Sequence, residues 1–406
     1  MPYRTDARGS RFDPPSPATS VGSDIGPFVA PVRILGAMLR PRRPRGTAAL
    51  LPAILLIAAC TATPASSPPA ARSGDPPASP STTASATASG TPSPSTSAGV
   101  APLAWAALDA AGPAAREDHT WTLDPEAGIA YLFGGREGAT IHGDTWAFDL
   151  ATDTWTQLAP PASPPPRFGH EAVWVEGRGV VIFAGQAGTT FYGDVWAFDP
   201  ESATWAALPA GGAAPVPRYG SCAALGPDGR LWISHGFTQD GNRFADTRAY
   251  DFATGYWTDE TPAGEVPVLR CLHGCWWTDD GELALYAGQT TGITSLEDRW
   301  RLADGAWTFV DGQLPPARNL YARARLDAAT LVFGGQALDG GYLGDLWLLA
   351  DDSDDARMLE PVGDGPQPAG RAGAEMIFDV EGGRALLFGG RTSDGALSDT
   401  WSLGGL

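Results

Sequence analysis

Residues 142–158 read HGDTWAFDLATDTWTQL, and residues 192–208 read YGDVWAFDPESATWAAL. Both segments place an Asp before a short aromatic stretch, and both carry a second Trp nine residues after the first. A pattern repeated at about fifty residues is typical of a fold built from copies of one structural unit. This repeat therefore guides the interpretation of the rest of the chain.

Residues 101–406 contain six copies of the pattern, and each copy has three marks. The first mark is an Arg that follows a turn rich in Pro or Ala: Arg116, Arg167, Arg218, Arg270, Arg318 and Arg371. The second is an apolar run that ends in two small residues or in His and Gly: 134–135, 184–185, 235–236, 287–288, 334–335 and 389–390. The third is an Asp before an aromatic strand: Asp144, Asp194, Asp246, Asp298, Asp345 and Asp399. Successive Arg marks are 51, 51, 52, 48 and 53 residues apart, so the copies agree in phase.

Each copy predicts four short strands. In the second copy these are FGHEAVWV (168–175), GVVIFAG (179–185), DVWAFD (194–199) and TWAAL (204–208), separated by turn residues. Four strands in a unit of about fifty residues predict one blade of a β-propeller. The paired small residues and the spaced aromatics resemble the kelch repeat, and the resemblance covers residues 101–406. The fifth copy departs from it, because the Trp of the last strand is replaced near Met358 or Leu359.

The sixth copy lacks its fourth strand, since only SLGGL follows Trp401. The missing strand is found at the other end of the domain, where WAALDAAGPAAR (105–116) matches WAALPAGGAAPVPR (205–218). We therefore predict an all-β, six-bladed propeller of kelch type with four strands per blade. The N-terminal strand, about residues 102–109, closes its last blade.

The segment 38–59 has the order of a secretory signal peptide. Four Arg precede the apolar stretch 48–59, which as a helix would span about 18 Å against a hydrocarbon core of roughly 30 Å. Residues 1–37 lack this order, so Met38 is the expected start. The sequence IAAC (57–60) resembles the lipobox of bacterial lipoproteins, which implies lipidation of Cys60. The alternative is a signal peptide with a chance Cys near its end.

Residues 60–100 predict a disordered tether. After Cys60 they are Pro, Ser, Thr, Ala or Gly except at Arg72, Asp75 and Val100, and such a segment buries too little apolar surface to fold. The chain after residue 59 has 19 basic and 43 acidic side chains, so nucleic acid is excluded as a partner. We expect an exported protein, held to a bacterial membrane by its lipid alone, with a monomeric propeller outside the cytoplasm.

Catalytic motifs are absent from the sequence. It has no G-x-S-x-G, P-loop, H-E-x-x-H or C-x-x-C pattern, and we predict no cofactor and no metal. Kelch propellers include galactose oxidase, but the Tyr and His context of its copper site is missing. His119, His170 and His273 each lie three residues after a blade Arg. They could form a metal ring, although hydrogen bonding inside the inner strand is the favoured interpretation.

Three cysteines lie in the propeller. Cys271 and Cys275 on one extended strand would be about 13 Å apart between Cα atoms, beyond the limit of about 7 Å for a disulfide. Cys222 and Cys275, at similar heights on neighbouring inner strands, are the better pair.

Two functions of different classes fit the sequence. The first is a binding lipoprotein that recognises a protein, peptide, glycan or cell-wall ligand on one propeller face. The second is an enzyme resembling the kelch-type sialic acid epimerases, which work by proton transfer on a sugar in the central funnel. Such an enzyme needs a paired acid and base, for which Glu171, Glu375, Glu117 and Asp118 are available. The sequence alone does not show that any two of these acids must be a catalytic pair, so the binding function is favoured.

The candidate ligand-binding residues come from two sets of loops that open on one face. The loops entering the inner strands supply the six blade Arg. The loops after the small pairs supply Arg136, Gln186, Gln289, Gln336 and Arg391. Arg grips carboxylates through two parallel hydrogen bonds. Other kelch domains use the matching Arg positions for acidic peptides, so the resemblance implies an anionic ligand. Alternatively, the blade Arg join neighbouring blades through Glu117, Asp118, Glu171 or Glu375.

Overall fold

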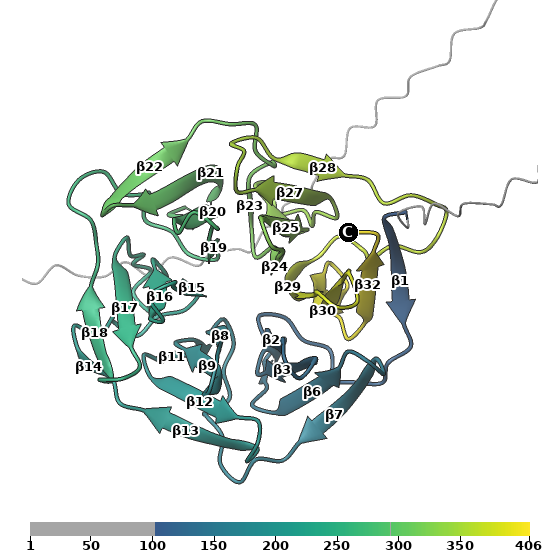
Figure 1. Ribbon diagram of the computed structural model, residues 1–406, viewed down its shortest axis with the longest axis horizontal. Helices are drawn as coiled ribbons and strands as arrows, with labels where there is room; N and C mark the ends of the chain where they lie inside the picture. Colours follow the sequence, from purple (N-terminus) through teal and green to yellow (C-terminus); the bar gives the residue numbers. More distant parts are fainter. Residues whose placement is uncertain (1–101, 293) are drawn as a thin grey trace, which may run out of the picture. The chain divides into compact units, whose positions relative to one another are not determined.

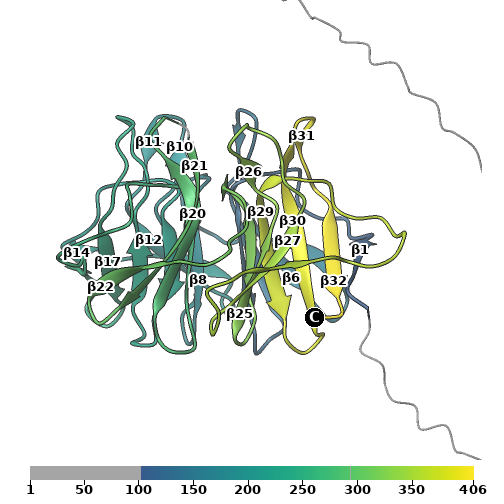
Figure 2. The same cartoon turned by 90° about the horizontal axis from the view of Figure 1, so that it is seen from above.

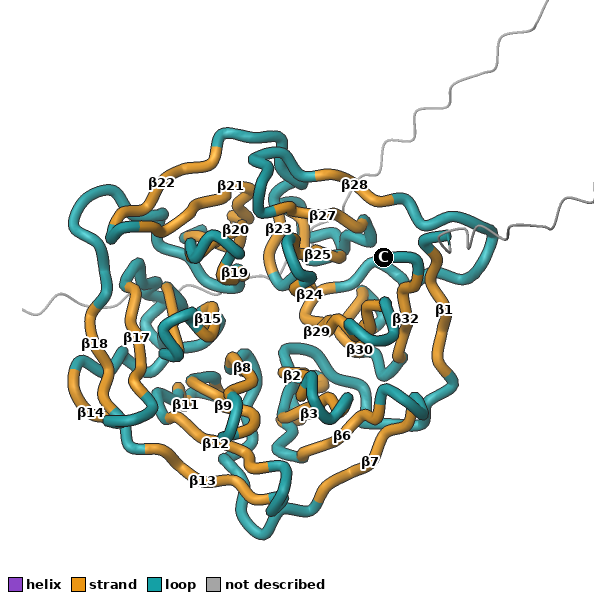
Figure 3. Tube along the Cα trace, in the orientation of Figure 1, coloured by secondary structure: helices purple, strands orange, loops and turns teal. Residues whose placement is uncertain are grey.

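The computed structural model describes residues 102–292 and 294–406, in which the regular elements are β-strands and no helix occurs (Figure 3). Six antiparallel sheets stand around a central axis like the blades of a propeller (Figure 1). Within these residues no helix is long and apolar enough to cross a membrane. The predicted signal peptide 38–59, Cys60 and the tether 60–100 lie outside the described residues.

The first three blades follow one another along the chain, each from its inner to its outer strand. Blade 1 contains β2 (Thr120–Asp124), β3 (Ile129–Phe133), β6 (Thr145–Asp149) and β7 (Thr154–Leu158). Blade 2 contains β8 (Glu171–Val175), β9 (Gly179–Phe183), β12 (Val195–Asp199) and β13 (Thr204–Leu208). Blade 3 contains β15 (Cys222–Leu225), β16 (Leu231–Ser234), β17 (Thr247–Asp251) and β18 (Tyr256–Asp259), with β14 (Gly211–Gly212) parallel to β18.

The last three blades continue the order, except that blade 6 takes its outer strand from the start of the domain. Blade 4 contains β19 (Gly274–Trp277), β20 (Leu283–Thr290), β21 (Thr294–Ala303) and β22 (Ala306–Val310). Blade 5 contains β24 (Ala322–Arg325), β25 (Ala329–Phe333), β27 (Leu346–Ala350) and β28 (Arg357–Leu359). Blade 6 contains β29 (Ala372–Asp379), β30 (Arg384–Thr392), β32 (Thr400–Gly404) and β1 (Ala104–Leu108).

The ring closes through β1, which pairs antiparallel with β32 from Ala104 opposite Gly404 to Leu108 opposite Thr400. Figure 1 shows this N-terminal strand beside the C-terminal blade. Trp105 of β1 is buried in the same cluster as Trp401. The predicted fold class is therefore confirmed, including closure of the last blade by about residues 102–109.

Aromatic side chains join neighbouring blades. Trp155 of blade 1 packs against Trp121 of its own blade, with ring centroids 5.2 Å apart, and against Phe388 of blade 6 at 4.9 Å. Its indole Nε1 also donates to Thr400 Oγ1 of blade 6 at 3.2 Å. Large aromatic rings bury much apolar area, so a repeated Trp in this position joins five of the six blades to the blade before them.

Blade 5 lacks this Trp, and the structure corrects where it is replaced. Leu346 pairs with Leu359 as Val195 pairs with Leu208 in blade 2, so the position of Trp205 corresponds to Ala356 rather than to Met358 or Leu359. Met358 is 48% exposed. The fully buried Arg299 of blade 4 donates instead to the carbonyls of Ala350 and Ser353, close to the shortened strand.

The second residue of each small pair is always Gly because its backbone and its neighbours both require it. These six glycines have φ between +88° and +115°, which residues with a Cβ rarely adopt. A Cβ on Gly135 would lie 2.8 Å from His119 Cβ and 2.9 Å from Glu117 O. The first residue has φ between +58° and +69°, a region that Ala184 and His235 can enter.

The two ends of the propeller differ. The hairpin face carries the loops between second and third strands, 134–144, 184–194, 235–246, 334–345 and 393–399, and in blade 4 the adjoining ends of β20 and β21. These loops contain β4 (Arg136–Glu137), β5 (Thr140–Ile141), β10 (Gln186–Ala187), β11 (Thr190–Phe191), β26 (Gln336–Ala337) and β31 (Gly395–Ala396), and β23 (Arg318–Asn319) pairs with β26. Figure 2 shows β10, β11 and β31 along one edge of the molecule. The turn face, at the other end, carries the short turns between first and second strands, such as 125–128 and 176–178.

Candidate functional site

The six blade arginines lie inside the blades. In blade 2, Arg167 donates from Nη1 and Nη2 to the two carboxylate oxygens of Asp194, at 2.7 and 3.0 Å. It also donates to the carbonyls of Ala184 and Pro165 at 3.0 and 3.1 Å. The same bidentate pair recurs in the other five blades, between Arg116 and Asp144, Arg218 and Asp246, Arg270 and Asp298, Arg318 and Asp345, and Arg371 and Asp399.

Each of these Asp receives a third donor. In five blades the indole Nε1 of the Trp two residues later donates to Oδ2 at 2.6 or 2.7 Å. In blade 3 the Nε of Arg248 donates to Asp246 at 3.1 Å instead. Burial alone would raise the pKa of these carboxyls, but the hydrogen bonds and charge of Arg lower it below its usual range.

The six arginines predicted as ligand-binding residues are only 0 to 2% exposed, and their guanidiniums are bound by groups of their own blades, so in this structure they are not accessible to a ligand. The structural alternative also named the wrong partners, since each Arg pairs with the Asp of its own blade. The sequence did contain the signal. Every blade Arg is followed 27 or 28 residues later by its Asp.

A ring of backbone hydrogen bonds surrounds the central channel just inside the hairpin face and narrows it. The residue two positions after each blade Arg donates its N–H to the carbonyl of the equivalent residue in the preceding blade, at 2.7 to 3.1 Å. The ring runs through Asp118, Gly169, Gly220, Leu272, Leu320 and Gly373 and closes on itself. All six have positive φ between +52° and +67°, which turns each chain into its inner strand.

Arg136 and Arg391 lie where the channel opens on the hairpin face, an opening that we call the mouth, and both hold carboxylates of this protein. Arg136 Nε is 3.2 Å from Glu117 Oε1, and its Nη2 is 3.1 Å from Asp118 Oδ2. Arg391 Nε is 2.8 Å from Glu117 Oε2. Burial, with the charge of Asp118, raises the pKa of Glu117 to about 7, against the lowering effect of the two arginines. The two Arg side chains are 26 and 29% exposed, so a ligand can still reach them.

Aromatic side chains border this cluster. The Arg136 guanidinium lies 4.3 Å from the centre of the buried Phe168 ring. Tyr219 donates its hydroxyl to Asp118 Oδ2 at 3.4 Å and packs edge-on against both Phe168 and Phe237. Phe191 of β11 packs on Phe237 with ring centroids 5.9 Å apart. Tyr219, Phe237 and Phe191 are half-buried, so their edges form part of the mouth.

The three predicted glutamines occupy the equivalent positions of other blades. Gln186 and Gln336 donate from Nε2 to carbonyls of their own hairpins, Gly188 O at 2.7 Å and Gly340 O at 3.3 Å. Gln289 Oε1 accepts from Arg243 Nη2 at 3.1 Å. The sequence missed Arg243, because no other blade repeats it.

Below the ring, three ionisable side chains meet in the channel. Arg323 of blade 5 reaches Glu171 of blade 2, on the opposite side of the axis, with Nη2 3.5 Å from Oε2. Glu375 of blade 6 lines the same cavity of about 50 Å³. Burial raises the pKa of Glu171 to about 7 and that of Glu375 to about 8, although Arg323 acts against both shifts. The two Glu were predicted from the sequence as candidate acids, whereas Arg323 was not.

The three histidines pack between blades rather than around one point. His119 lies edge-on to Phe388 of blade 6, and His170 lies edge-on to Phe133 of blade 1 with its Nε2 2.9 Å from Thr120 Oγ1. His273 packs against His235. Burial lowers the pKa of each ring. In residues 102–292 and 294–406, no three His, Cys, Asp or Glu side chains are arranged to hold a metal ion.

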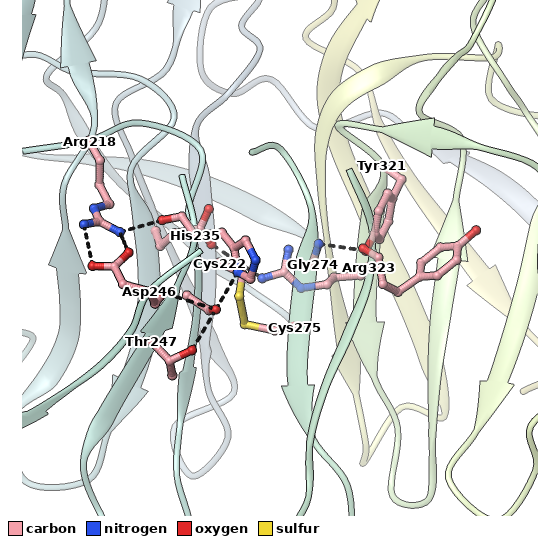
Figure 4. The surroundings of a disulfide bond; sticks show 12 residues. Arg218, Cys222, His235, Asp246, Thr247, Gly274, Cys275, Tyr321 and Arg323 are labelled. Atoms are coloured by element: carbon pink, nitrogen blue, oxygen red, sulfur yellow. Dashed lines mark hydrogen bonds and ion pairs between the residues drawn. A yellow bond between two sulfur atoms is a disulfide. The ribbon is translucent and has the colours of Figure 1, made fainter. Parts of the chain in front are cut away.

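Cys222 and Cys275 form a disulfide between the inner strands of blades 3 and 4, with Cα atoms 5.6 Å apart (Figure 4). This is the pair that the sequence favours. Cys271 is a buried free thiol near the hairpin face, and its Sγ lies 3.7 Å from Gln289 O. Figure 4 also shows Tyr321, whose hydroxyl accepts from Gly274 N, beside Arg323.

Residues 99–288 match the family model of the KLHDC2/KLHL20/DRC7 Kelch-repeats domain. Among curated proteins, the chain is 31% identical over 151 residues to tRNA wybutosine-synthesizing protein 4 of Emericella nidulans, covering 34% of this chain and 14% of that protein. It is 26% identical over 288 residues to Adagio protein 3 of Arabidopsis thaliana, covering 65% and 45%. It is 30% identical over 218 residues to the serine/threonine-protein phosphatase BSL2 of the same plant, covering 51% and 21%. The chain thus spans less than half the length of each relative.

Proposed function

Starting from a six-bladed propeller of kelch type, we propose that this protein is an exported, lipid-anchored binding protein whose hairpin face recognises a peptide, glycan or cell-wall ligand. The observation that carries the proposal is the mouth of that face, where Arg136 and Arg391 are partly exposed beside the half-buried Tyr219, Phe237 and Phe191. Arg and large aromatics dominate the binding energy of protein interfaces, since they bury much area and donate directional hydrogen bonds.

The ligand chemistry follows from the charge of the mouth. Glu117 and Asp118 balance the two arginines, so the mouth is not a bare cationic patch. A ligand carboxylate would compete with Glu117 for Arg391, and the raised pKa of Glu117 lets that side chain take up a proton as it is displaced. We therefore propose a ligand that presents one carboxylate together with apolar or hydroxyl groups, rather than a polyanion.

The enzyme alternative is supported by one observation, the meeting of Glu171 and Glu375 with raised pKa values in the channel. The geometry is unfavourable for a sugar. Arg323 lies against Glu171, and the cavity that both carboxyls line measures about 50 Å³, whereas small-ligand sites measure roughly 300 to 1,000 Å³. A binding function is the better proposal.

Screening the purified full-length protein on glycan and peptide arrays tests the proposal, with hits measured by calorimetry. We expect Arg391→Ala to weaken binding about tenfold or more, because it removes an exposed carboxylate donor. Arg357→Ala, which removes an exposed Arg from β28 away from the mouth, is the matched control. Equal affinity of the Arg391→Ala protein for a confirmed ligand would exclude the hairpin face.

Anchoring is tested separately through Cys60. The lipobox-like IAAC predicts that Cys60→Ser leaves the protein soluble or unprocessed when cells are fractionated. Membrane association that survives this substitution would show that another feature holds the protein there.

A further inference from the structure

On the turn face the axial channel widens into a hollow of about 440 Å³, lined by the inner strands of all six blades. This hollow, which we call the funnel, lies in the size range of small-ligand sites, roughly 300 to 1,000 Å³. Arg323 and Glu375 line both the funnel and the narrow cavity above it, so they form its floor. Glu171 lines the narrow cavity alone, behind Arg323.

The walls of the funnel are mainly apolar and fixed in place. Apart from the floor, the charged residue that lines it is Arg325, which is held by the carboxylates of Asp279 and Asp351. Trp174 stacks on Tyr131 of the neighbouring blade with an interplanar angle of 8°, and Trp277 packs edge-on against Trp232 at 5.3 Å. Both indoles are half-buried and line the hollow. Small side chains such as Ala224 on the other inner strands leave the centre open. Rigid aromatic walls of this kind lower the entropic cost of holding an apolar ligand.

The floor contains fewer cations than carboxyl groups. Arg323 is shared by two carboxyl groups and makes its ion pair with Glu171. Within the described residues no ion pair involves Glu375, although it faces the same guanidinium. An ionised carboxylate that leaves water without a partner is costly, so the floor favours a group that brings a positive charge to Glu375.

We propose that the funnel binds an organic monocation with an apolar body, its ammonium against Glu375 and its hydrocarbon against Trp174 and Trp277. The site is on the opposite face from the mouth described above, so it goes beyond the proposed binding function and does not depend on it. Aromatic faces attract cations, which adds to the ion pair. The domain is strongly acidic, and this favours the approach of a cation over that of an anion.

Proton release should accompany binding. The charged groups around Glu375 are Arg323, Glu171 and Asp118, and burial with the two acids raises its pKa to about 8 in spite of Arg323. An ammonium beside Glu375 stabilises the ionised carboxylate and lowers that pKa. At neutral pH the carboxyl therefore loses a proton when the cation binds.

Titration calorimetry of the full-length protein tests the inference with 2-phenylethylammonium as the probe. Phenylacetate and 2-phenylethanol are the anionic and neutral probes of similar shape. We expect the cation alone to bind well, with a heat that changes between buffers of different ionisation enthalpy. Glu375→Gln should weaken it about tenfold or more. Glu381→Gln, on the exposed turn of the same blade, should leave it unchanged.

Thr122→Trp supplies an independent check, because a large side chain at this funnel-lining position should fill the site without touching the charged floor. Its far-UV circular dichroism and melting temperature establish that it is folded. The inference is overturned if the cation fails to bind at millimolar concentration, if phenylacetate binds as tightly, or if neither Glu375→Gln nor Thr122→Trp weakens the cation.

Discussion

Arg167 of blade 2 and Arg391 of blade 6 both occupy positions near the hairpin face, yet their environments are opposite. Arg167 is fully buried and bidentate to Asp194, and its counterparts make the same contacts in all six blades. Arg391 is partly exposed at the mouth and has an Arg counterpart only in blade 1. The interior of the blades is thus uniform, and the mouth is not.

The difference teaches where function can lie in a repeated fold. A residue that occurs in every copy meets a requirement that every copy shares. Here the requirement is to satisfy the buried carbonyl at the end of the second strand and the Asp before the third strand of each blade. A ligand breaks the pseudo-symmetry, so it requires residues that differ between copies. Arg391 at the mouth and Arg323 with Glu375 in the channel are of this second kind.

The largest expected effect is the loss of β1. Deleting residues 101–109 removes the outer strand of blade 6 and with it the buried Trp105. In blades 1 to 5 the outer strand instead follows the third strand directly in the sequence. We expect the protein to lose its cooperative unfolding transition, measured by circular dichroism during denaturation. A stable, monomeric deletion variant would show that the closing strand and its Trp are dispensable. The contrast between uniform structural positions and variable functional positions would then fail.

Arg167→Ala tests the buried set directly. The change leaves Asp194 and the carbonyl of Ala184 without their main donor, and breaking a buried ion pair costs about 3 to 5 kcal/mol. We expect about 3 kcal/mol, because the side chain of Asp194 is 36% exposed and water can partly replace the Arg. Urea denaturation measures the loss.

Arg178→Ala is the control for Arg167→Ala, since it removes an exposed Arg from the same blade. Surface changes of this kind usually alter the free energy of unfolding by about 0.5 kcal/mol or less. Equal losses for the two variants would mean that burial does not distinguish the two kinds of arginine.

The fold could be predicted from the sequence because its evidence is repeated six times. The Arg, the Gly pair and the Asp recur in phase, and the match of residues 105–116 to 205–218 located the closing strand. Where one copy was irregular the prediction was less accurate. The Trp of blade 5 was sought at Met358 or Leu359, whereas the strand register places Ala356 there.

The candidate site was harder to predict for the same physical reason. Arg323, Arg243 and the Tyr219 hydroxyl each occur in one blade, so no periodicity marks them. Their partners are also distant in sequence, as in the pair of Arg323 with Glu171 across the axis. Conversely, the regularity of the six blade Arg suggested a ligand ring, although it reflects a shared structural need.

The two arginines of the mouth should contribute differently to the free energy of unfolding. Arg136 pairs with Asp118, whose side chain is 1% exposed, so Arg136→Ala leaves a buried carboxylate uncompensated and should cost about 2 kcal/mol. Arg391→Ala leaves Glu117 paired with Arg136 and should cost less than about 1 kcal/mol. Urea denaturation of both variants sharpens the comparison. Equal costs would show that Asp118 does not depend on Arg136.

The last expected effect is the pH dependence of stability, to which the two regions contribute with opposite sign. The blade Asp have lowered pKa values, so their stabilisation is present at neutral pH and is lost in acid. Glu375 has a pKa raised to about 8, so the folded protein holds a proton that the unfolded chain has released above about pH 4.5. The contribution of Glu375 to the free energy of unfolding should therefore fall as pH rises from 5 to 8, whereas the buried histidines, with lowered pKa values, contribute in the opposite direction. Relative to the unchanged protein, Glu375→Gln should gain stability as pH rises from 5 to 8 and should keep the loss below pH 4, as measured by urea denaturation of both proteins across pH. A profile that is unchanged by Glu375→Gln would mean that this carboxyl titrates alike in the folded and unfolded states, and the charged floor of the funnel would then lose its electrostatic distinction from the solvated surface.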